Sequence, residues 1–301
     1  MQRKIRNRLL LVFILSFPFL VLLGCFIFLS DELPAWPPMP KQNGYGELVK
    51  AGDMVSSNTF DYERMNQPQL ARLVSQNAAA LSVARTGLFH ECAVPVEFST
   101  NYIDAHLDQL SDLKRLAEAF MAEGALAKAE SHPDDVVHSD LNAIQLADDA
   151  SRGGVLLDQL VGTAIEGMGT RQMAGILPQL DAATCRQAAK RLEALDAQRQ
   201  TWAQVMQQEH NWSRRAFPGL RYELARILTH RIMDQAIQKP EGRFNAQVWK
   251  TRQLMIALAA RAYELDKGKA PASIGDLAPD YLKAIPQDPA TGTNLVFQPA
   301  Q

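Results

Sequence analysis

The sequence contains few of the residues and motifs that are typical of several classes of protein. Its 301 residues contain three cysteines and 7% aromatic residues, and the formal net charge is −2. A slightly acidic chain lacks the basic surface that nucleic-acid binding requires. The glycines follow no pattern for a phosphate loop or a dinucleotide turn, because no lysine–hydroxyl pair and no preceding strand accompany them. We therefore expect neither a nucleic-acid partner nor a cofactor.

The residues that are abundant favour helices. Hydrophobic residues make up 47% of the chain and charged residues 21%, which is ordinary for a globular protein. Alanine, leucine, glutamine, arginine and glutamate dominate, and these residues favour helix over sheet. The predicted fold class is all-α: one N-terminal transmembrane helix, then an extracytoplasmic array of several helices, then a small C-terminal unit of extended chain and turns.

Leu9–Leu29 is an uncharged apolar run of about 21 residues, and roughly 20 residues suffice to span a bilayer as a helix. Four basic residues precede it, and positive charge tends to stay in the cytoplasm. The run is longer than the apolar core of a cleaved signal, and Ser30–Pro34 offers no small-x-small cleavage site. We expect a single-pass protein of the inner membrane, with the bilayer as partner through Leu9–Leu29 and the C-terminal part in the periplasm.

The three cysteines have different expected surroundings. Cys25 lies in the apolar run, where Leu22-Leu23-Gly24-Cys25 resembles a bacterial lipobox, so lipidation of Cys25 is the alternative to an intact membrane helix. Cys92 and Cys185 lie in the exported part. They either form a disulfide, which an oxidising compartment permits, or remain two separate buried thiols.

The composition along the chain predicts five segments. They are a basic cytoplasmic segment at 1–8, the transmembrane helix at 9–29, a proline-rich linker at 30–46, a helical extracytoplasmic domain at 47–242 and a C-terminal unit at 243–301. Apolar residues at helical spacing predict the helices of the domain. One long helix is expected from its cap at Asp181 to about Gln208, and another is expected to end at Lys239–Gly242. Three glycines, at 162, 167 and 169, predict tight helix packing.

The C-terminal unit contains residues that mark helix ends and turns. Gly268 predicts a left-handed helix end, Ser273 with Asp276 predicts a capping box, and Asn294–Phe297 predicts an edge strand. One string runs through it: Ala262-Tyr263-Glu264-Leu265-Asp266-Lys267-Gly268-Lys269-Ala270-Pro271, then Ser273, Asp276-Leu277, Tyr281-Leu282, Pro286, Asp288-Pro289 and Gly292. This string resembles the helix-to-sheet junction of type II secretion pseudopilins. The resemblance implies a structural module and carries over no calcium ligand.

A second resemblance covers more of the chain. The segment in question is Leu146-Ala147-Asp148-Asp149-Ala150-Ser151-Arg152-Gly153-Gly154-Val155-Leu156-Leu157-Asp158-Gln159-Leu160-Val161-Gly162. It resembles a group of uncharacterised, membrane-anchored helical proteins of bacterial envelopes that end in the same module. The resemblance implies an envelope location and no particular activity.

Polar side chains are densest between His132 and Asp140. His132, Asp134 and His138 are residue types that bind metals, although their spacing matches no standard site. Helix capping by Asp134, Asp135 or Ser139 is the alternative and the one we favour. A basic aromatic stretch at Glu209–Arg215 is either a patch for anions or glycans or a charged helix end. The sequence assigns no catalytic residue and no metal ligand set.

Two functions follow from these patterns. The anchor, the linker and the helical body favour a structural or interaction module of the cell envelope, with protein partners and a possible link to a secretion or pilus-like system. The alternative is a membrane-tethered envelope hydrolase or ligand-binding protein. An enzyme is the less favoured of the two.

Overall fold

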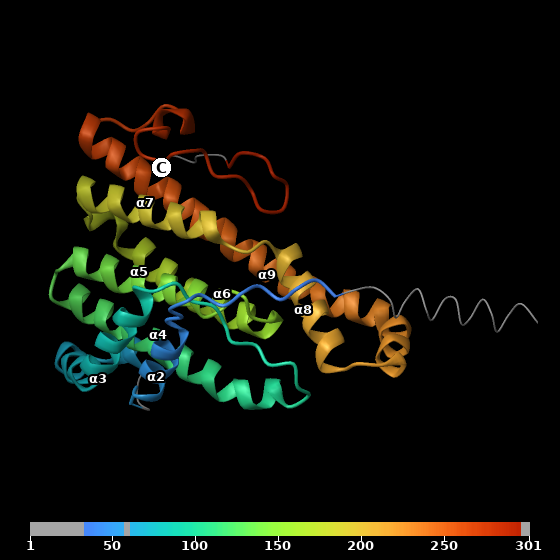
Figure 1. Cartoon of the computed structure of the whole chain (residues 1–301). Helices are drawn as coiled ribbons and strands as arrows, with labels where there is room; N and C mark the ends of the chain where they lie inside the picture. The colour runs from blue at the N-terminus through green and yellow to red at the C-terminus, as the bar shows by residue number, and fades with distance from the viewer. Residues whose placement is uncertain (1–32, 57–60, 296–301) are drawn as a thin grey trace, which may run out of the picture. The chain divides into compact units, whose positions relative to one another are not determined.

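A computed structural model describes residues 33–56 and 61–295, with the backbone alone for 220–236. The chain divides into two compact units, Met1–Pro37 and Pro38–Gln301, and the second is described below. Over the described residues it contains eight α-helices, and extended chain pairs only at one isolated bridge between Gln287 and Asn294 (Figure 1). The predicted all-α fold is confirmed.

The helices follow one another with short connections. Their bounds are α2 Tyr45–Asp53, α3 Gln67–Leu88, α4 Tyr102–Ala129, α5 Pro133–Asp149, α6 Leu156–Ile176, α7 Ala182–Gln198, α8 Trp202–Ala216 and α9 Leu220–Lys267. Three short 3₁₀ helices join them: η1 Tyr62–Arg64, η2 Leu177–Gln179 and η3 Ile274–Leu277. In Figure 1, α5 and α6 lie between α2–α4 on one side and α7 with α9 on the other.

Two hydrophobic clusters form the core, and α5 contributes to both. Leu146 packs with α2, α3 and α4, whereas Ile144 packs with α7 and α9. Successive residues of a helix point in different directions, so one helix buried on two sides can serve two clusters. The position of α5 therefore joins the N-terminal and C-terminal halves of the helical array.

Several predicted helix ends are confirmed. The Asp181 carboxylate accepts a hydrogen bond from the Thr184 N–H at 2.7 Å and begins α7. Gly268 ends α9 in the left-handed conformation, with φ 68°. The Asp276 carboxylate accepts from the Ser273 N–H at 2.9 Å at the start of η3. These local rules act through neighbouring residues and so can be recognised in the sequence.

The long helix predicted from Asp181 to Gln208 is wrong, because the chain breaks into α7 and α8. Arg199 leaves the helical conformation with ψ 134°. Thr201 then begins α8: its N–H donates to Gln204 Oε1 at 2.8 Å, and its hydroxyl accepts from the Gln204 N–H at 3.3 Å. This capping box was present in the sequence, but the apolar spacing continues across it and concealed the break.

The helix end predicted at Lys239–Gly242 is also wrong. α9 continues through Pro240, so the boundary expected between 242 and 243 falls inside this helix. Proline removes one backbone hydrogen bond and costs about 3 kcal/mol within a helix. Burial of Phe244 and Val248 directly after it supplies packing that offsets this cost.

The N-terminal linker is attached to the segment between α3 and α4 through Asn43. Its side-chain amide donates to the Ala93 carbonyl at 2.8 Å, and its Oδ1 accepts from the Ala93 N–H at 3.0 Å. The Gly44 N–H donates to the Glu91 carbonyl at 3.1 Å. One residue further along that segment, the Val94 N–H donates to the Arg152 carbonyl at 2.8 Å, which extends the connection to the link between α5 and α6.

A fully buried carboxylate joins α6 to α4. Asp158 Oδ2 accepts from the Val155 N–H at 2.7 Å, which satisfies a free donor at the start of α6. Asp158 Oδ1 lies 2.6 Å from Nε2 of His106 on α4, and both side chains are buried. Because a buried polar group needs hydrogen-bond partners, this contact fixes the relative position of the two helices.

A second buried network joins α6, the link after α7, and α9. The Arg199 guanidinium donates to both oxygens of Glu166, at 2.8 and 2.5 Å. The Thr251 hydroxyl donates to Glu166 Oε1 at 2.6 Å. The glutamate is therefore satisfied from two elements at once, and the break between α7 and α8 positions the arginine for this role.

Two of the three predicted glycines, Gly162 and Gly169, allow close contact of α6 with α5, whereas Gly167 faces Gln247 on α9. A Cβ on Gly162 would lie 2.6 Å from the Ala147 carbonyl oxygen, and one on Gly169 would lie 2.8 Å from the Ile144 side chain. Contacts this short do not occur between real atoms of these types. The bare backbone of α6 at these turns is thus a requirement of its packing on α5.

The predicted cytoplasmic segment 1–8 and the predicted membrane helix Leu9–Leu29, including Cys25, lie outside the described residues. The first residues of the predicted linker, 30–32, and the end of the edge strand predicted at Asn294–Phe297 lie outside them as well. Among the helices of the described residues, none combines the length and the apolar character that crossing a membrane requires. The membrane anchor stays a prediction.

We predict that Gly162→Ala lowers the free energy of unfolding by about 1–3 kcal/mol, because the added methyl forces α5 and α6 apart. Urea denaturation of the purified protein would measure it. Gly175→Ala in the same helix is the control: no atom lies within 4 Å of its added Cβ, so alanine should be neutral or stabilising. Equal destabilisation by both variants would contradict the packing role.

Candidate functional site

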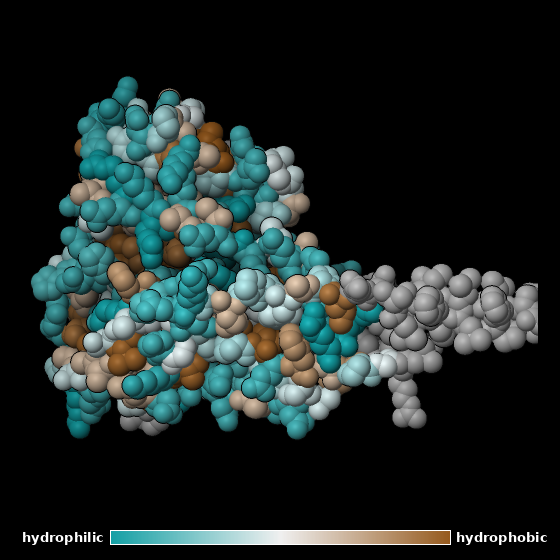
Figure 2. Space-filling view, viewed as in Figure 1, coloured by the Kyte–Doolittle hydropathy of each residue, from teal (hydrophilic) through white to brown (hydrophobic). Residues whose placement is uncertain are grey.

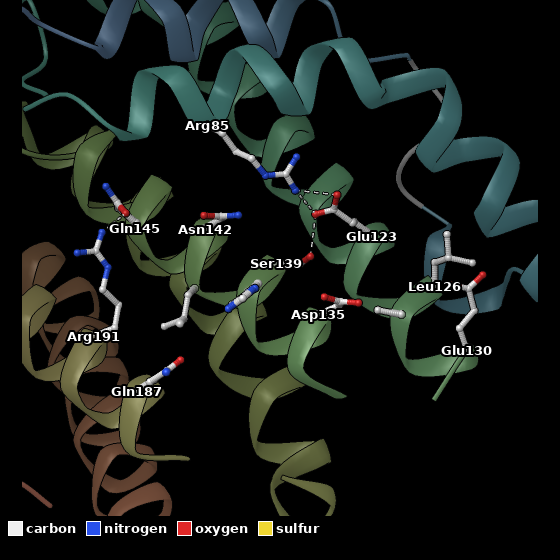
Figure 3. A pocket seen from close by; sticks show the side chains of 13 residues that line it. Arg85, Glu123, Leu126, Glu130, Asp135, Ser139, Asn142, Gln145, Gln187 and Arg191 are labelled. Atoms are coloured by element: carbon white, nitrogen blue, oxygen red, sulfur yellow. Dashed lines mark hydrogen bonds and ion pairs between the residues drawn. The ribbon is translucent and has the colours of Figure 1, made fainter. Parts of the chain in front are cut away.

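A polar cleft of about 670 Å³ opens between α3, α4, α5 and α7 (Figure 3). Its size is within the range of ligand sites, about 300–1,000 Å³. The side chains that line it are mostly charged or carry amides: Arg85, Glu123, Leu126, Ala127, Glu130, Asp135, His138, Ser139, Leu141, Asn142, Gln145, Gln187 and Arg191. Residues from distant parts of the chain thus form one hydrogen-bonding surface.

Arg85, Glu123 and Ser139 form a fixed cluster in the wall of the cleft. Arg85 Nη2 donates to both oxygens of Glu123, at 2.7 and 2.6 Å, and the Ser139 hydroxyl donates to Glu123 Oε2 at 2.7 Å. The Arg85 guanidinium also lies 5.6 Å from the centroid of the Phe120 ring. Charge-assisted hydrogen bonds and ring contact hold these side chains in one arrangement.

Arg191 and Gln145 form the opposite wall. Arg191 Nη2 donates to Gln145 Oε1, and the Gln145 amide donates to the Leu88 carbonyl at 2.6 Å and to Asp149 Oδ2 at 3.2 Å. Gln145 thus uses both ends of its amide to orient the arginine. The exposed Arg191 guanidinium, with five donors, is presented to the cleft in a fixed position.

Charge is distributed unevenly across the cleft. Arg191 lies on one side, whereas Glu130 and Asp135 lie on the other (Figure 3). Between these, the Arg85–Glu123 pair is neutral overall. A ligand with an acidic group at one end and a basic group at the other would match this distribution.

A neighbouring hollow of about 560 Å³ shares Gln145 and Arg191 with the cleft and also contacts Asp149. Burial raises the pKa of Asp149 to about 7, and its neighbour Asp148 adds to the rise, while Arg152, Gln145 and Arg191 oppose it. Burial also raises the pKa of Asp140, which faces the core, well above its usual value. Asp149 therefore titrates near neutral pH at the edge of the cleft.

The three candidate metal ligands, His132, Asp134 and His138, lie in different surroundings. His132 is 62% exposed, with Nδ1 3.9 Å from the carboxylates of Glu130 and Asp135. Asp134 accepts a hydrogen bond from the Thr184 hydroxyl at 2.7 Å, and His138 lines the cleft. Within the described part of the chain, no group of three or more histidine, cysteine or acidic side chains is placed to hold a metal.

The capping alternative is not what the structure shows, because the N-cap residue of α5 is His132 and no side chain caps this helix. Asp134 and Asp135 occupy the first turn of α5, where negative charge interacts favourably with the helix dipole. Ser139 does not cap a helix, because it lies in the second turn of α5 and bonds to Glu123 on α4. These residues are close in the sequence but face different directions, because neighbouring residues of a helix do not face one another.

The stretch Glu209–Arg215 lies within α8, and its largest side chains face inward. Trp212 is buried and donates its indole N–H to the Glu97 carbonyl at 2.9 Å. Glu209 accepts from the Leu156 N–H at 2.8 Å. Arg214 and Arg215 lie in the last turn, as the charged helix end alternative predicts. The buried indole cannot provide an exposed surface for glycans.

Cys92 and Cys185 are free, buried thiols in different clusters of the core. Cys92 packs with α2, α3 and α4, whereas Cys185 packs with α7 and α9. A disulfide requires the two Cα atoms within about 7 Å. The structure therefore has the second alternative, two separate thiols, in place of the disulfide.

Comparison of the chain with protein-family models, with curated proteins and with solved structures found no match. Both resemblances noted in the sequence stay predictions.

We predict that the protein becomes less stable as the pH rises from about 4 to about 7. In this range folded Asp149 keeps a proton that the unfolded chain, with a pKa of about 3.9, has lost, and each such difference changes stability by about 1.4 kcal/mol per pH unit. Asp149→Asn should reduce this slope, and the remainder should come from Asp140 and Glu209, whose pKa values burial also raises. Urea denaturation at several pH values measures it.

The control for this prediction is Asp135→Asn, because the Asp135 side chain is 69% exposed. This variant should keep the slope of the unchanged protein. A slope that is the same in the Asp149 variant would show that Asp149 ionises normally in the folded state.

We predict two free thiols for a chain that carries Cys25→Ser. Labelling with a maleimide in denaturant, without reductant, should modify both Cys92 and Cys185, because neither is bonded in the fold. The same reagent should react slowly with the folded protein, since burial raises the thiol pKa of Cys92 to about 12 and that of Cys185 to about 11. A chain that resists labelling until it is reduced would contain the disulfide.

Proposed function

We propose that the protein is a membrane-attached interaction module of the cell envelope, and that it binds a segment of a partner protein in the cleft between α3, α4, α5 and α7. The observation that carries this proposal is the cleft itself, which gathers polar side chains from four helices and holds them by contacts within the protein.

Preorganisation is the first reason. Glu123 is held by Arg85 and Ser139, and Arg191 is held by Gln145, so these side chains lose little conformational freedom when a ligand arrives. Ordering of side chains costs about 0.5–1.5 kcal/mol each when an interface forms. Because contacts within the protein already order these side chains, ligand binding costs less conformational entropy.

The character of the surface is the second reason. On the face in Figure 2, hydrophobic residues form small separate areas between polar ones. The large exposed apolar side chains, such as Phe89, Leu107 and Trp249, belong to different elements. An interface built on such a surface is polar and reversible, unlike the apolar interface of a permanent complex.

The sequence supplies the setting. Leu9–Leu29 would anchor the chain in the inner membrane, and the proline-rich linker would hold the helical body at a distance from it. The pseudopilin-like C-terminal string favours a secretion or pilus-like system as the location of the partner. The module would then present its cleft to envelope proteins on the periplasmic side.

Photocrosslinking in intact cells tests the proposal. A photoreactive amino acid in place of Gln187, which is exposed and lines the cleft, should give a discrete adduct with another protein. Arg191→Glu in the same chain should reduce the adduct several-fold, because it reverses the charge at one end of the cleft. Capture from solubilised membranes and mass spectrometry would identify the partner.

The matched control is the same photoreactive residue at Gln76, which is exposed on α3 outside the cleft. It should give no such adduct. Adducts of equal yield at both positions, or adducts with the protein itself alone, would count against a partner site in the cleft.

A further inference from the structure

A second cleft, of about 380 Å³, lies at the break between α7 and α8. Its walls come from three parts of the chain: residues 196–203 at the end of α7 and the start of α8, the segment of α9 from Glu241 to Arg252, and the turn from Gln287 to Gly292. Its volume is at the small end of ligand sites, about 300–1,000 Å³, and suits one or two sugar rings.

Two aromatic rings form one wall of this cleft. Trp202 is partly buried and Phe244 is buried, with their ring centroids 5.6 Å apart. The capping box of Thr201 and Gln204 fixes the backbone where Trp202 begins α8. Among the described residues the indole N–H of Trp202 has no hydrogen-bond partner. Trp202 therefore offers an apolar face together with a free donor.

Two polar side chains on α9 lie beside the rings. Glu241 and Asn245 are one turn apart, so they lie on the same side of the helix, and both are half-buried in the wall of the cleft. Neither side chain bonds to another residue of the described chain. A carboxylate and an amide at this spacing can accept from and donate to neighbouring hydroxyl groups.

The charges of the cleft exclude an anionic ligand. Both arginines in its walls are already engaged: Arg199 with Glu166 and Asp196, and Arg252 with Asp196 and the Gln287 carbonyl. Acidic side chains outnumber basic ones along the walls. A phosphate or carboxylate would meet repulsion there.

A wholly apolar ligand is excluded as well. It would take Glu241 and Asn245 out of water without replacing their hydrogen bonds, which costs free energy for each group. The ligand that remains has an apolar face for the indole and neutral hydroxyl groups for the carboxylate and the amide. Pyranose rings have both, since their C–H groups gather on one face and their hydroxyls around the edge.

We infer that the cleft bounded by Trp202, Glu241, Asn245 and the 287–292 turn is a binding site for a neutral saccharide. The ring stacks on the indole of Trp202, while hydroxyl groups donate to Glu241 and accept from Asn245. The Arg252–Gln287 hydrogen bond holds the turn that closes one side of the site. This site shares no residue with the cleft of the proposed function.

Calorimetric titration of the full-length protein tests this inference. The protein is held in a polyoxyethylene detergent, which has no sugar headgroup, and titrated with cellobiose, maltose and N,N′-diacetylchitobiose, and with digalacturonic acid as an anionic probe. At least one neutral disaccharide should bind at millimolar concentration or better. Digalacturonic acid should bind at least tenfold more weakly.

Variants locate the binding. Trp202→Ala should weaken it at least tenfold, whereas Trp249→Ala should leave it unchanged, because Trp249 is 42% exposed on α9 outside the cleft. Asn245→Ala should also weaken it, and this half-buried position tests the site even if the Trp202 variant does not fold. Circular dichroism and thermal melting check the fold of each variant.

The inference is overturned if none of the neutral disaccharides binds, if digalacturonic acid binds as well as they do, or if binding survives in folded Trp202 or Asn245 variants. These outcomes are separate from those of the photocrosslinking at Gln187. Loss of the partner adduct with saccharide binding intact would remove the proposed function alone.

Discussion

The buried side chain of Asp158 is the constraint on which the N-terminal half of the array depends. It accepts from the Val155 N–H at the start of α6, and its Oδ1 lies 2.6 Å from Nε2 of His106 on α4. Loss of either partner would leave a buried polar group unpaired, which costs about 1–3 kcal/mol. α4 and α6 therefore have one relative position, and α5 packs between them and the rest of the core. Because α4 and α5 line the cleft, this contact also helps to set the geometry of the cleft.

The sequence predicted the helices well where one helix buries one stripe, and poorly where tertiary contacts decide. Apolar spacing predicted the helical character of the domain, and local chemistry located the caps at Asp181 and Gly268. The break at Arg199 was missed because α7 and α8 keep the same spacing on both sides of it. Continuation through Pro240 was missed because the packing of Phe244 outweighs a strong local preference.

Neither candidate site could be predicted from the sequence, because each is formed by residues that are far apart in the chain. Arg85 and Glu123 are brought together by packing of α3 on α4, and nothing local to either residue indicates the other. The residues around His132 are close together in the sequence and of metal-binding types, yet the fold turns them in different directions. One feature of the sequence indicated the position of Trp202. The Thr-x-x-Gln capping box that begins at Thr201 marks a helix start in the middle of a predicted helix.

The attachment of Asn43 has a mechanical consequence. Tension that reaches Asn43 from the N-terminal side is shared with other parts of the fold before it reaches α2. There the load is shared by the two bonds from the Asn43 amide to Ala93 and by the Gly44–Glu91 bond. The Val94–Arg152 bond passes it on to the link between α5 and α6. Part of a pull on the N-terminal segment is thereby delivered to the link between α5 and α6, and α2 does not carry the load alone.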